Sequence, residues 1–462
     1  MSSRRNGPQE DLANVLAAFV CRTAYDDVPQ AVRELAKRHL LDCFGVGLAG
    51  TTSKAAAVLA GFLDDEGGNP VASVFGRRQR TSPRQAAFAN GVLGHAHDFD
   101  GTSWPMIGHP TITVLPAVLA LGERARASGQ DTLLAFVLGV EVACQLGASL
   151  NPSLYEAGWH ATGVLGTLGA AAGAAKVLGL DVQRTANALG LAASSASGLR
   201  ENFGSMAKPF HAGHAAEAGA LAADLAGRGF GAQPAVLDSP RGFCHAFAGV
   251  EGVAGDLAPR LGNPYSILSP GINIKPYASC AGSHPALDAL LSLVREHDVK
   301  PEEVEAVAVG VGPVQPMMLI YPEPQTGLQG KFSMPYLMAV ALRERAAGLA
   351  QFSDERVRDP ATRDLMRRVR MYRHPDLDAY DAVHSVPAAV TLRLRDGREL
   401  VRRVDTARGY PENPLSDEEL LAKFKECAGL ALPRRRAEDL AEAVLRLDEL
   451  ADVNQLTELL RA

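Results

Sequence analysis

The chain has 462 residues, of which 47% are hydrophobic, 21% charged and 6% aromatic, and its formal net charge at pH 7 is −6. This composition is that of a folded globular protein, and the length predicts two domains. A mildly negative chain without a long run of like charges argues against nucleic-acid binding, so an anionic substrate would need a local basic pocket.

The N-terminal residues and the cysteines both bear on where in the cell the protein works. The polar start, residues 1–11, has no apolar segment of the kind found in a secretory signal. The six cysteines are widely scattered and form no Cys-x-x-Cys pair, a usage typical of free thiols in a reducing compartment. We therefore expect a cytoplasmic protein that does not enter a membrane.

The first half of the chain is predicted to be almost entirely helical. Apolar residues recur with helical spacing from about residue 12 to residue 227, interrupted by proline and glycine. Three segments have clear helical length: 114–127, 132–147 and 161–180. The last has a glycine every three or four residues, at positions 163, 166, 169 and 173. This stripe of small residues predicts close helix packing rather than ligand binding.

The pattern changes after about residue 265. An alternating segment at 304–311 predicts a strand, and 389–395 and 398–404 predict a hairpin with a type I′ turn at Asp396-Gly397. Two helices are expected nearby, at about 284–296 and 332–345. The tail returns to helix, beginning with a capping box from Ser416 to Glu419.

These elements predict a mainly α fold with an inserted α+β domain. A large helical domain would hold both ends of the chain, residues 1–266 and 408–462. A smaller α+β lid domain would span residues 267–407. No internal repeat or low-complexity segment is evident.

The first candidate cluster begins at His95. Within His95-Ala-His97-Asp98-Phe99-Asp100 four side chains titrate, and His109 follows shortly after. Acid–base chemistry explains the cluster best, with helix capping as the plainer alternative. A metal-dependent hydrolase using His95, His97 and Asp98 is a rival of another class, but Phe99 stands where the usual ligand pattern needs an aspartate.

Two further histidine and lysine motifs lie in the helical half. His160 lies at the start of the glycine-rich helix, where the helix dipole favours a neutral imidazole and bound anions. Lys208 precedes a proline, which predicts extended backbone and a break in the helix, and His211 and His214 follow it. Taken singly, a capping histidine or a solvated lysine would explain each motif.

The fourth motif lies at the predicted entrance to the inserted domain. Lys275 again precedes a proline, and His284-Pro285 follows at the start of a predicted helix. Lysine and histidine can bind carboxylates, and histidine exchanges protons near neutral pH. On these residues alone, a His284 that merely caps its helix is an equal alternative.

Taken together, the motifs contain lysine, histidine and aspartate but no clear nucleophile. The sequence has no Gly-x-Ser-x-Gly elbow, no Walker loop and no Rossmann fingerprint. Such a set can hold carboxylates with cations and move protons with imidazoles. Removing a proton next to a carboxylate creates enolate-like charge, which the lysines would stabilise.

Six ordered blocks resemble the MmgE/PrpD family, which includes 2-methylcitrate dehydratase, cis-aconitate decarboxylase and iminodisuccinate epimerase. They are HAHDFDGT…GHP, GWHATGVLGTLGAAAGAAKVLGLD, SMAKPFHAGHAA, KPYASCAGSHPALDA, GKFSMPYLMAVAL and ARGYPENPLSDEELLAKF. They run from about residue 90 to residue 424. The resemblance therefore covers most of the chain.

The resemblance implies a helical domain with a smaller α+β lid, a homodimer, an active site between the domains, and no metal or organic cofactor. By motif position it implies catalytic roles for Asp98, His109, His160, Lys208 and His284. It also implies substrate contacts by Thr102 and, on a loose match, by Tyr321. Gly101 stands where the family often has a second aspartate.

Our working hypothesis is a cofactor-independent lyase whose partner is a small di- or tricarboxylic acid. Lys208 and Lys275 would bind substrate carboxylates, and His160 and His284 would exchange protons at the reacting carbon. The outcome of the proton step stays open between dehydration and decarboxylation, with epimerisation as the alternative. The sequence does not identify the acid.

Overall fold

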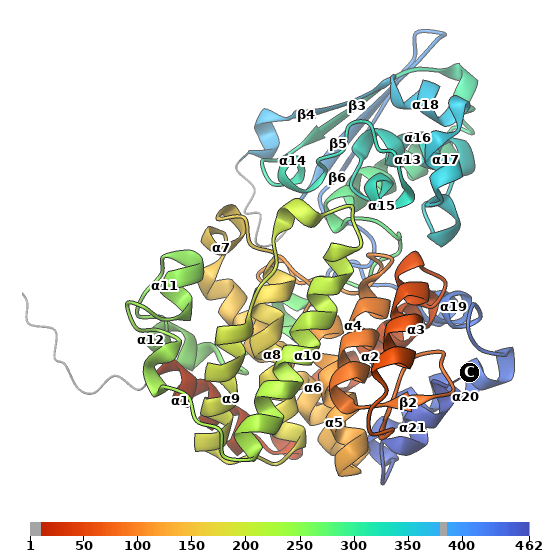
Figure 1. Ribbon diagram of the computed structural model, residues 1–462. Coiled ribbons are helices and arrows are strands. Elements are labelled where there is room, and N and C mark those ends of the chain that lie inside the picture. The colour runs from red at the N-terminus through yellow and green to blue at the C-terminus, as the bar shows by residue number, and fades with distance from the viewer. Residues whose placement is uncertain (1–10, 379–385, 462) are drawn as a thin grey trace, which may run out of the picture.

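The computed structural model describes residues 11–378 and 386–461, and it forms a helical domain below a smaller α+β lid (Figure 1). The predicted fold class, mainly α with an inserted α+β domain, is thus confirmed. One set of apolar cores lies in the helical domain and includes residues from both its early and its final helices. Another core fills the lid.

The helices and strands have the following bounds. In the first part of the chain the helices are α1 Leu12–Arg22, α2 Gln30–Gly50, α3 Lys54–Glu66, α4 Pro83–His95, α5 Pro110–Ala125, α6 Gly129–Leu150, α7 Ser153–Glu156, α8 Ala161–Val177, α9 Val182–Ser195, α10 Ala207–Gly227, α11 Phe243–Ala248 and α12 Ala254–Leu257. The remaining helices are α13 His284–Glu296, α14 Gln315–Met318, α15 Gly327–Gly330, α16 Met334–Glu344, α17 Asp354–Arg358, α18 Pro360–Met366, α19 Asp417–Ala428, α20 Arg434–Leu445 and α21 Asn454–Leu459. The strands are β1 Ala72–Ser73, β2 Arg80–Thr81, β3 Val304–Val311, β4 Val369–Arg373, β5 Ala388–Leu394 and β6 Glu399–Val404.

The helical domain is built around α8, which packs against α5, α6 and α10. Its glycine stripe is what permits this packing. A Cβ at Gly163 would lie 2.3 Å from the Ser197 carbonyl oxygen, and one at Gly169 would lie 2.7 Å from the Gly139 oxygen. The packing role predicted for these glycines is confirmed. In this packing α6, long and apolar enough by composition to cross a membrane, has 89% of its apolar window buried within the fold.

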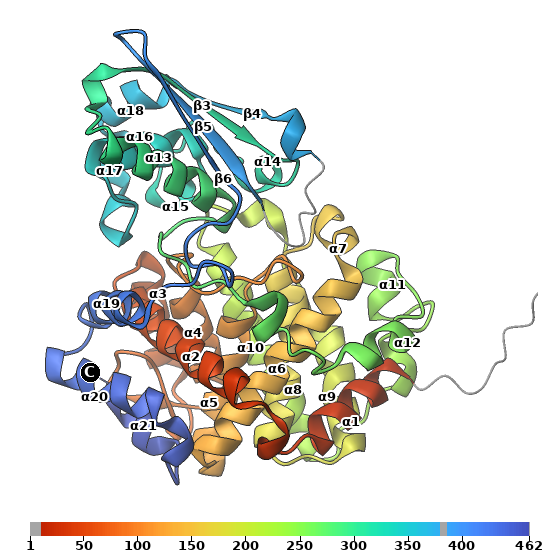
Figure 2. The same ribbon diagram turned by 180° about the vertical axis from the view of Figure 1, so that it is seen from behind.

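The lid is one four-stranded sheet with the order β4-β3-β5-β6. Strand β3 pairs in parallel with β4 and antiparallel with β5, and β5 and β6 form the predicted hairpin. Helix α13 packs on β5 and β6, while α16 packs on β4 (Figure 2). The chain then returns to the helical domain, where α19 and α20 pack against α2.

Two local predictions need correction, and one strand was missed. The hairpin turn is not type I′, because only Gly397 has a positive φ. The Gly397 N–H donates to the Leu394 oxygen and the Leu394 N–H to the Arg398 oxygen, which makes a three-residue loop that ends in a left-handed glycine. Lys208 is not extended, because α10 already begins at Ala207 and its proline falls within the first turn, where it costs no hydrogen bond. Strand β4 was not predicted, since its five residues include three half-buried positions and two exposed ones.

Candidate active site

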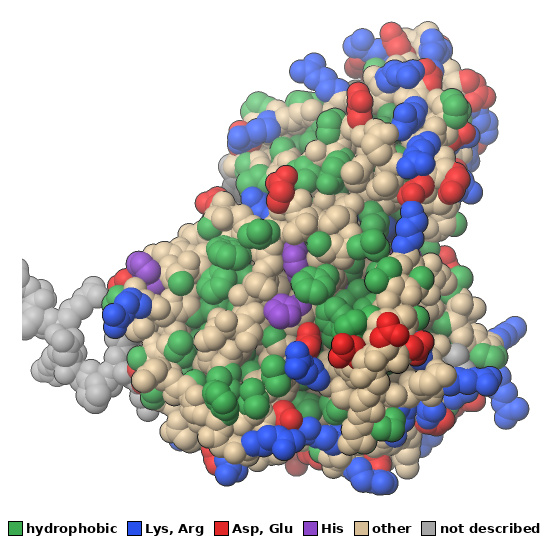
Figure 3. Space-filling view, viewed as in Figure 1, with side chains coloured by type: hydrophobic (Ala, Val, Ile, Leu, Met, Phe, Trp, Pro, Cys, Tyr) green, Lys and Arg blue, Asp and Glu red, His purple; other side chains and the backbone are tan. Residues whose placement is uncertain are grey.

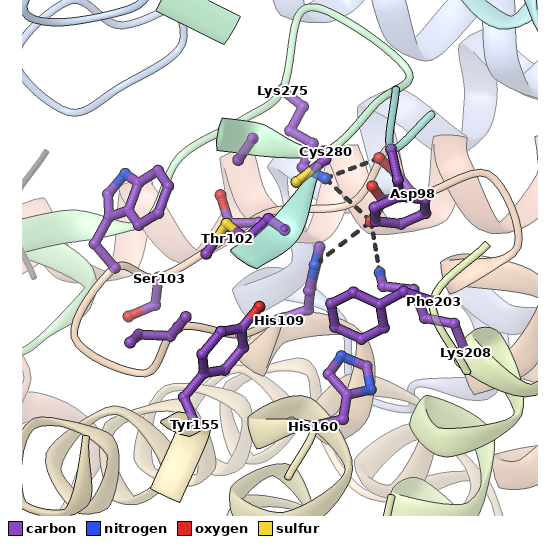
Figure 4. Close-up of a pocket in the computed structure, with 16 residues that line it drawn as sticks. Asp98, Thr102, Ser103, His109, Tyr155, His160, Phe203, Lys208, Lys275 and Cys280 are labelled. Carbon is purple, nitrogen blue, oxygen red and sulfur yellow. Dashed lines mark hydrogen bonds and ion pairs between the residues drawn. The ribbon is translucent and has the colours of Figure 1, made fainter. Parts of the chain in front are cut away.

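A narrow pocket lies where the helical domain meets the lid (Figure 4). It is lined by Asp98, Thr102, Ser103, Trp104, Ile107, Gly108, His109, Tyr155, His160, Phe203, Lys208, Lys275, Cys280, Ala281, Met318 and Phe332. Four aromatic or aliphatic members of this wall, Trp104, Ile107, Tyr155 and Phe203, belong to the apolar core of the lid. The wall is therefore shared between the two domains.

The loop between α4 and α5 supplies one side of the pocket. Helix α4 ends at His95, and His109 is the N-cap residue of α5, with Pro110 at its first position. Between them Thr102 forms a two-way backbone bridge with Asn273, whose side-chain amide also donates to the Thr102 hydroxyl at 3.2 Å. Asp98 has a left-handed φ of 50°, a strained conformation that side chains at functional sites often adopt.

Asp98 lies at the centre of the pocket's charge. Its Oδ1 is 2.7 Å from the Lys208 ammonium and 3.3 Å from that of Lys275, which also donates to the Asp98 backbone oxygen at 2.8 Å. Burial alone would raise the pKa of Asp98, but the two ammonium groups outweigh it and hold that pKa well below its usual range. Its Oδ2 is buried and has no hydrogen-bond partner within the described residues.

The Asp100 carboxylate contacts two imidazole rings. Its carboxylate lies 2.9 Å from His95 Nδ1 and 2.9 Å from His109 Nδ1. His95 Nε2 in turn accepts a hydrogen bond from Lys208 at 2.8 Å, so Nδ1 of this ring carries its proton. His109 Nδ1 makes a close ion-pair contact with Asp100 but no hydrogen bond of good geometry, and its Nε2 lies 3.6 Å from Asp98 Oδ1.

The imidazoles around the pocket are neutral when it is empty. Burial lowers the pKa of His109 to about 3, and it lowers that of His160 well below 6.5, with Lys208 adding to the effect. Both residues are N-caps, of α5 and α8, where the helix dipole also disfavours imidazolium. His160 Nδ1 faces His211 Nδ1 at 3.0 Å, so one of the two carries the shared proton.

Six of the eight predicted site residues line this one pocket: Asp98, Thr102, His109, His160, Lys208 and Lys275. The other two do not line it. His284 is buried behind Tyr277, with its Nε2 3.2 Å from the Ser279 oxygen. Tyr321 donates its hydroxyl to the Phe203 oxygen at 2.6 Å and packs on Gly204. The catalytic roles of all eight stay predictions.

The predicted metal ligand set of the rival hydrolase is not assembled. His97 lies 3.1 Å from the Ala49 carbonyl oxygen, on the far side of the loop from Asp98. A different group, His95, Asp98, Asp100 and His109, brings its ligand atoms within 4.8 Å of one another. However, the Lys208 ammonium already contacts both His95 and Asp98. Because that cation occupies the position a metal would take, this donor set does not fit one.

Sequence reasoning missed several members of the site. Asp100, Cys280 and Phe332 all lie inside motifs that were noticed, but no local signal distinguished them from their neighbours. Also missed was Lys331, a buried lysine that follows α15 and lies next in the chain to the pocket residue Phe332. A lysine preceding an apolar helix is usually a surface residue, so only the three-dimensional packing identifies it.

The comparisons with known proteins cover nearly the whole chain. Residues 14–254 match the MmgE/PrpD N-terminal domain, and residues 277–449 match the MmgE/PrpD C-terminal domain. The chain is 31% identical to the cis-aconitate decarboxylase of Mus musculus, over 92% of this chain and 88% of that protein. It is 31% identical to the Homo sapiens cis-aconitate decarboxylase, over 93% and 90%, and 30% identical to that of Aspergillus terreus (strain NIH 2624 / FGSC A1156), over 95% and 93%.

Proposed function

The chain belongs to the MmgE/PrpD family, and from this premise and the pocket we propose that it is a lyase that decarboxylates a small unsaturated tricarboxylic acid, cis-aconitate or a near relative. The observation that carries the proposal is the convergence of Lys208 and Lys275 on one pocket whose imidazoles are neutral. Decarboxylase relatives at about this level of identity support the same reaction class.

The lysines can bind substrate without leaving Asp98. Each ammonium has three N–H donors, and the described contacts engage two of them in each case. The remaining N–H groups can donate hydrogen bonds to carboxylate oxygens of the substrate. On binding, the carboxylates of the substrate would exchange their hydrating water for charge-assisted hydrogen bonds from the two lysines.

The reaction needs one proton and no oxidant. In an acid of the form C=C–CH₂–COO⁻ the C–C bond to the carboxylate breaks and its electron pair becomes a new C=C bond. The former double-bond pair moves to the carbon beside another carboxylate, and that carbon takes up a proton. A trianion and one proton give a dianion and CO₂. The lysines stabilise the negative charge that develops on the carboxylate beside that carbon.

His109 is the proton donor in this proposal. Asp100 holds its Nδ1, and Nε2 faces Asp98 and the pocket. Burial keeps the empty ring neutral, but bound carboxylates add negative charge beside it and raise its pKa, so that binding and protonation are coupled. His160, opposite, orients the substrate or shares the proton with His211. Asp98 and Thr102 position the lysines and the loop.

The proposal is tested with purified, EDTA-treated protein and a panel of cis-aconitate, citrate, 2-methylcitrate and iminodisuccinate. We expect CO₂ release from cis-aconitate at a rate that metal addition does not change. Water loss from citrate or 2-methylcitrate without CO₂ would replace decarboxylation by dehydration. Inversion of iminodisuccinate alone would make the protein an epimerase, and activity only with added metal would overturn the cofactor-free mechanism.

We also propose that the chain works as a homodimer in a reducing cytoplasm. All six cysteines are free thiols, which supports the reducing compartment.

The dimer is supported by an apolar groove between α3, α4 and α10. It exposes Val58, Phe62, Met206 and Phe210, and Figure 3 shows hydrophobic side chains gathered on this face. An oppositely charged pair, Arg84 and Glu217, borders it, so a second copy could meet it self-complementarily. Light scattering should give twice the chain mass, and Phe62→Asp should give a monomer.

A further inference from the structure

Lys331 is a buried cation that the proposed mechanism does not use. Its side chain is 2% exposed, and its ammonium donates to the Ala278 carbonyl oxygen at 2.6 Å and lies 4.1 Å from the centroid of the Phe352 ring. No carboxylate pairs with it among the described residues. Burying an ammonium without a paired anion costs folding free energy, so a bound anion would stabilise this site.

The environment of Lys331 is a second cavity between the domains. The helical domain contributes Thr52, His97 and Met206 to its wall, and the lid contributes Lys331 and Phe352. In Figure 1 this region lies where α3 faces α15 and α17. Its acidic members are Asp354, which pairs with Lys54 at 2.6 Å, and the exposed Glu355. Neither of these carboxylates pairs with Lys331, so among the described residues this lysine has no ionic partner in the cleft.

The cleft and the active pocket are lined by consecutive residues of the chain at four places. At each, one residue lines the pocket and its neighbour in the chain lines the cleft. The four pairs are Asp98 with His97, Phe203 with Gly204, Lys208 with Pro209, and Phe332 with Lys331. The two spaces are thus immediate neighbours.

Two aromatic rings, Phe203 and Phe332, line the active pocket where their chain neighbours Gly204 and Lys331 line the cleft. The ring centroids are 5.5 Å apart, and the Lys208 ammonium lies 5.4 Å from each. Phe203 comes from the helical half of the chain and Phe332 from the lid segment, so an anion passing between the rings requires these two segments to move apart.

We propose that this cleft is a vestibule in which Lys331 binds a carboxylate anion before it passes between Phe203 and Phe332 into the active pocket. This deepens the proposed function, on which it rests, by assigning the route of the substrate. Burial lowers the pKa of Lys331 to about 7, so the ammonium is readily restored when an anion arrives. Lys331 binds the anion in transit and takes no part in the chemical step.

The test counts anion sites with propane-1,2,3-tricarboxylate, a saturated acid that cannot undergo the allylic decarboxylation. Equilibrium dialysis should find two equivalents bound per chain in the unmodified protein. Lys331→Gln, which keeps a donor for the Ala278 oxygen but removes the charge, should bind one, as should Lys208→Met. Lys331→Arg should again bind two. One equivalent in the unmodified protein, or two in Lys331→Gln, would overturn the vestibule.

Kinetics give an independent readout. Lys331→Gln should lower kcat/KM for the substrate about tenfold and leave kcat within about twofold, whereas the matched surface variant Lys300→Met should change neither. A fall in kcat alone would contradict a role in entry. Because dialysis needs no turnover, absence of decarboxylation would count against the proposed function and leave the vestibule to be judged on the binding data.

Discussion

Two buried aspartates, Asp42 and Asp98, show how similar residues serve different purposes in this chain. Asp42 pairs with the single ammonium of Lys423 at 2.6 Å, which also donates to the Phe99 oxygen. Burial dominates there and raises the pKa of Asp42. Asp98 has two ammonium groups and ionises far more readily. The first group is a one-to-one internal ion pair, whereas the second is a carboxylate that contacts two ammonium groups.

This difference teaches where to look for chemistry. A buried pair that neutralises itself fixes the structure: Lys423 anchors Phe99, in the loop that carries Asp98. The two lysines that contact Asp98 keep N–H donors for an anion, in agreement with a polycarboxylate substrate.

The largest effect should come from removing one pocket cation. Lys208→Met is predicted to lower kcat/KM about 1,000-fold, because the developing carboxylate charge loses a direct partner. Thermal unfolding should show a folded protein. Near-normal activity of Lys208→Met would mean that the Asp98 group, like the Asp42 pair, serves only the structure.

The structural pair should respond in the opposite way. Lys423→Met is predicted to reduce the free energy of unfolding by about 3–5 kcal/mol, since Asp42 is left buried without its cation. Urea unfolding measures this loss, and kcat of the folded protein should change little. The double variant Asp42→Asn/Lys423→Met should recover part of the stability. A stable single variant with no kcat would show that this pair belongs to the active site.

Replacing Asp100 should lower kcat less than replacing Lys208 lowers kcat/KM, and more than replacing Lys423 changes kcat. Asp100→Asn is predicted to lower kcat about 100-fold, because the amide no longer holds His109 in its reactive orientation. KM should change much less, since Asp100 does not line the pocket. An equal change in KM would assign it to substrate binding instead.

A further prediction concerns how stability depends on pH. Burial lowers the pKa of His39, His109 and His284 to about 3 and that of His97 to about 4. In the unfolded chain these groups bind protons below about pH 6.5. The unfolded state therefore gains protons first as the pH falls, and each histidine removes up to about 1.4 kcal/mol of stability per pH unit.

Urea unfolding between pH 7.5 and 5.0 checks this prediction. Stability should fall steeply as the pH drops below about 6.5. The variant His97→Gln, which can still donate to the Ala49 oxygen, should reduce the slope. A stability that rises toward pH 5 would mean that these imidazoles are charged in the folded protein.

Much of the fold could be predicted because its signals are local. The proline of His284-Pro285 and the capping box at Ser416 begin α13 and α19 where predicted. The hairpin was predicted from Asp396-Gly397, but its turn type was wrong because the loop has three residues and only Gly397 takes a positive φ. The proline after Lys208 predicted a break, but a proline is equally suited to a first helical turn.

The site was predictable only in part. The motifs identified Lys208 and Asp98 separately, yet their contact joins residues 110 positions apart, which no spacing rule reveals. Likewise Tyr321 was placed by resemblance, but its hydroxyl binds a backbone oxygen outside the pocket. Lys331 lacked any local mark of burial. Tertiary packing, rather than residue type, decides each of these cases.

The central claim is proton delivery to carbon without a metal, and one measurement tests it most directly. EDTA-treated protein is incubated with cis-aconitate in D₂O, and the product is followed by proton NMR. The account predicts loss of CO₂ and one deuterium on the carbon beside the remaining carboxylate, at a rate that falls sharply in His109→Gln. No exchange and no product from cis-aconitate, or an unchanged rate in His109→Gln, would contradict it.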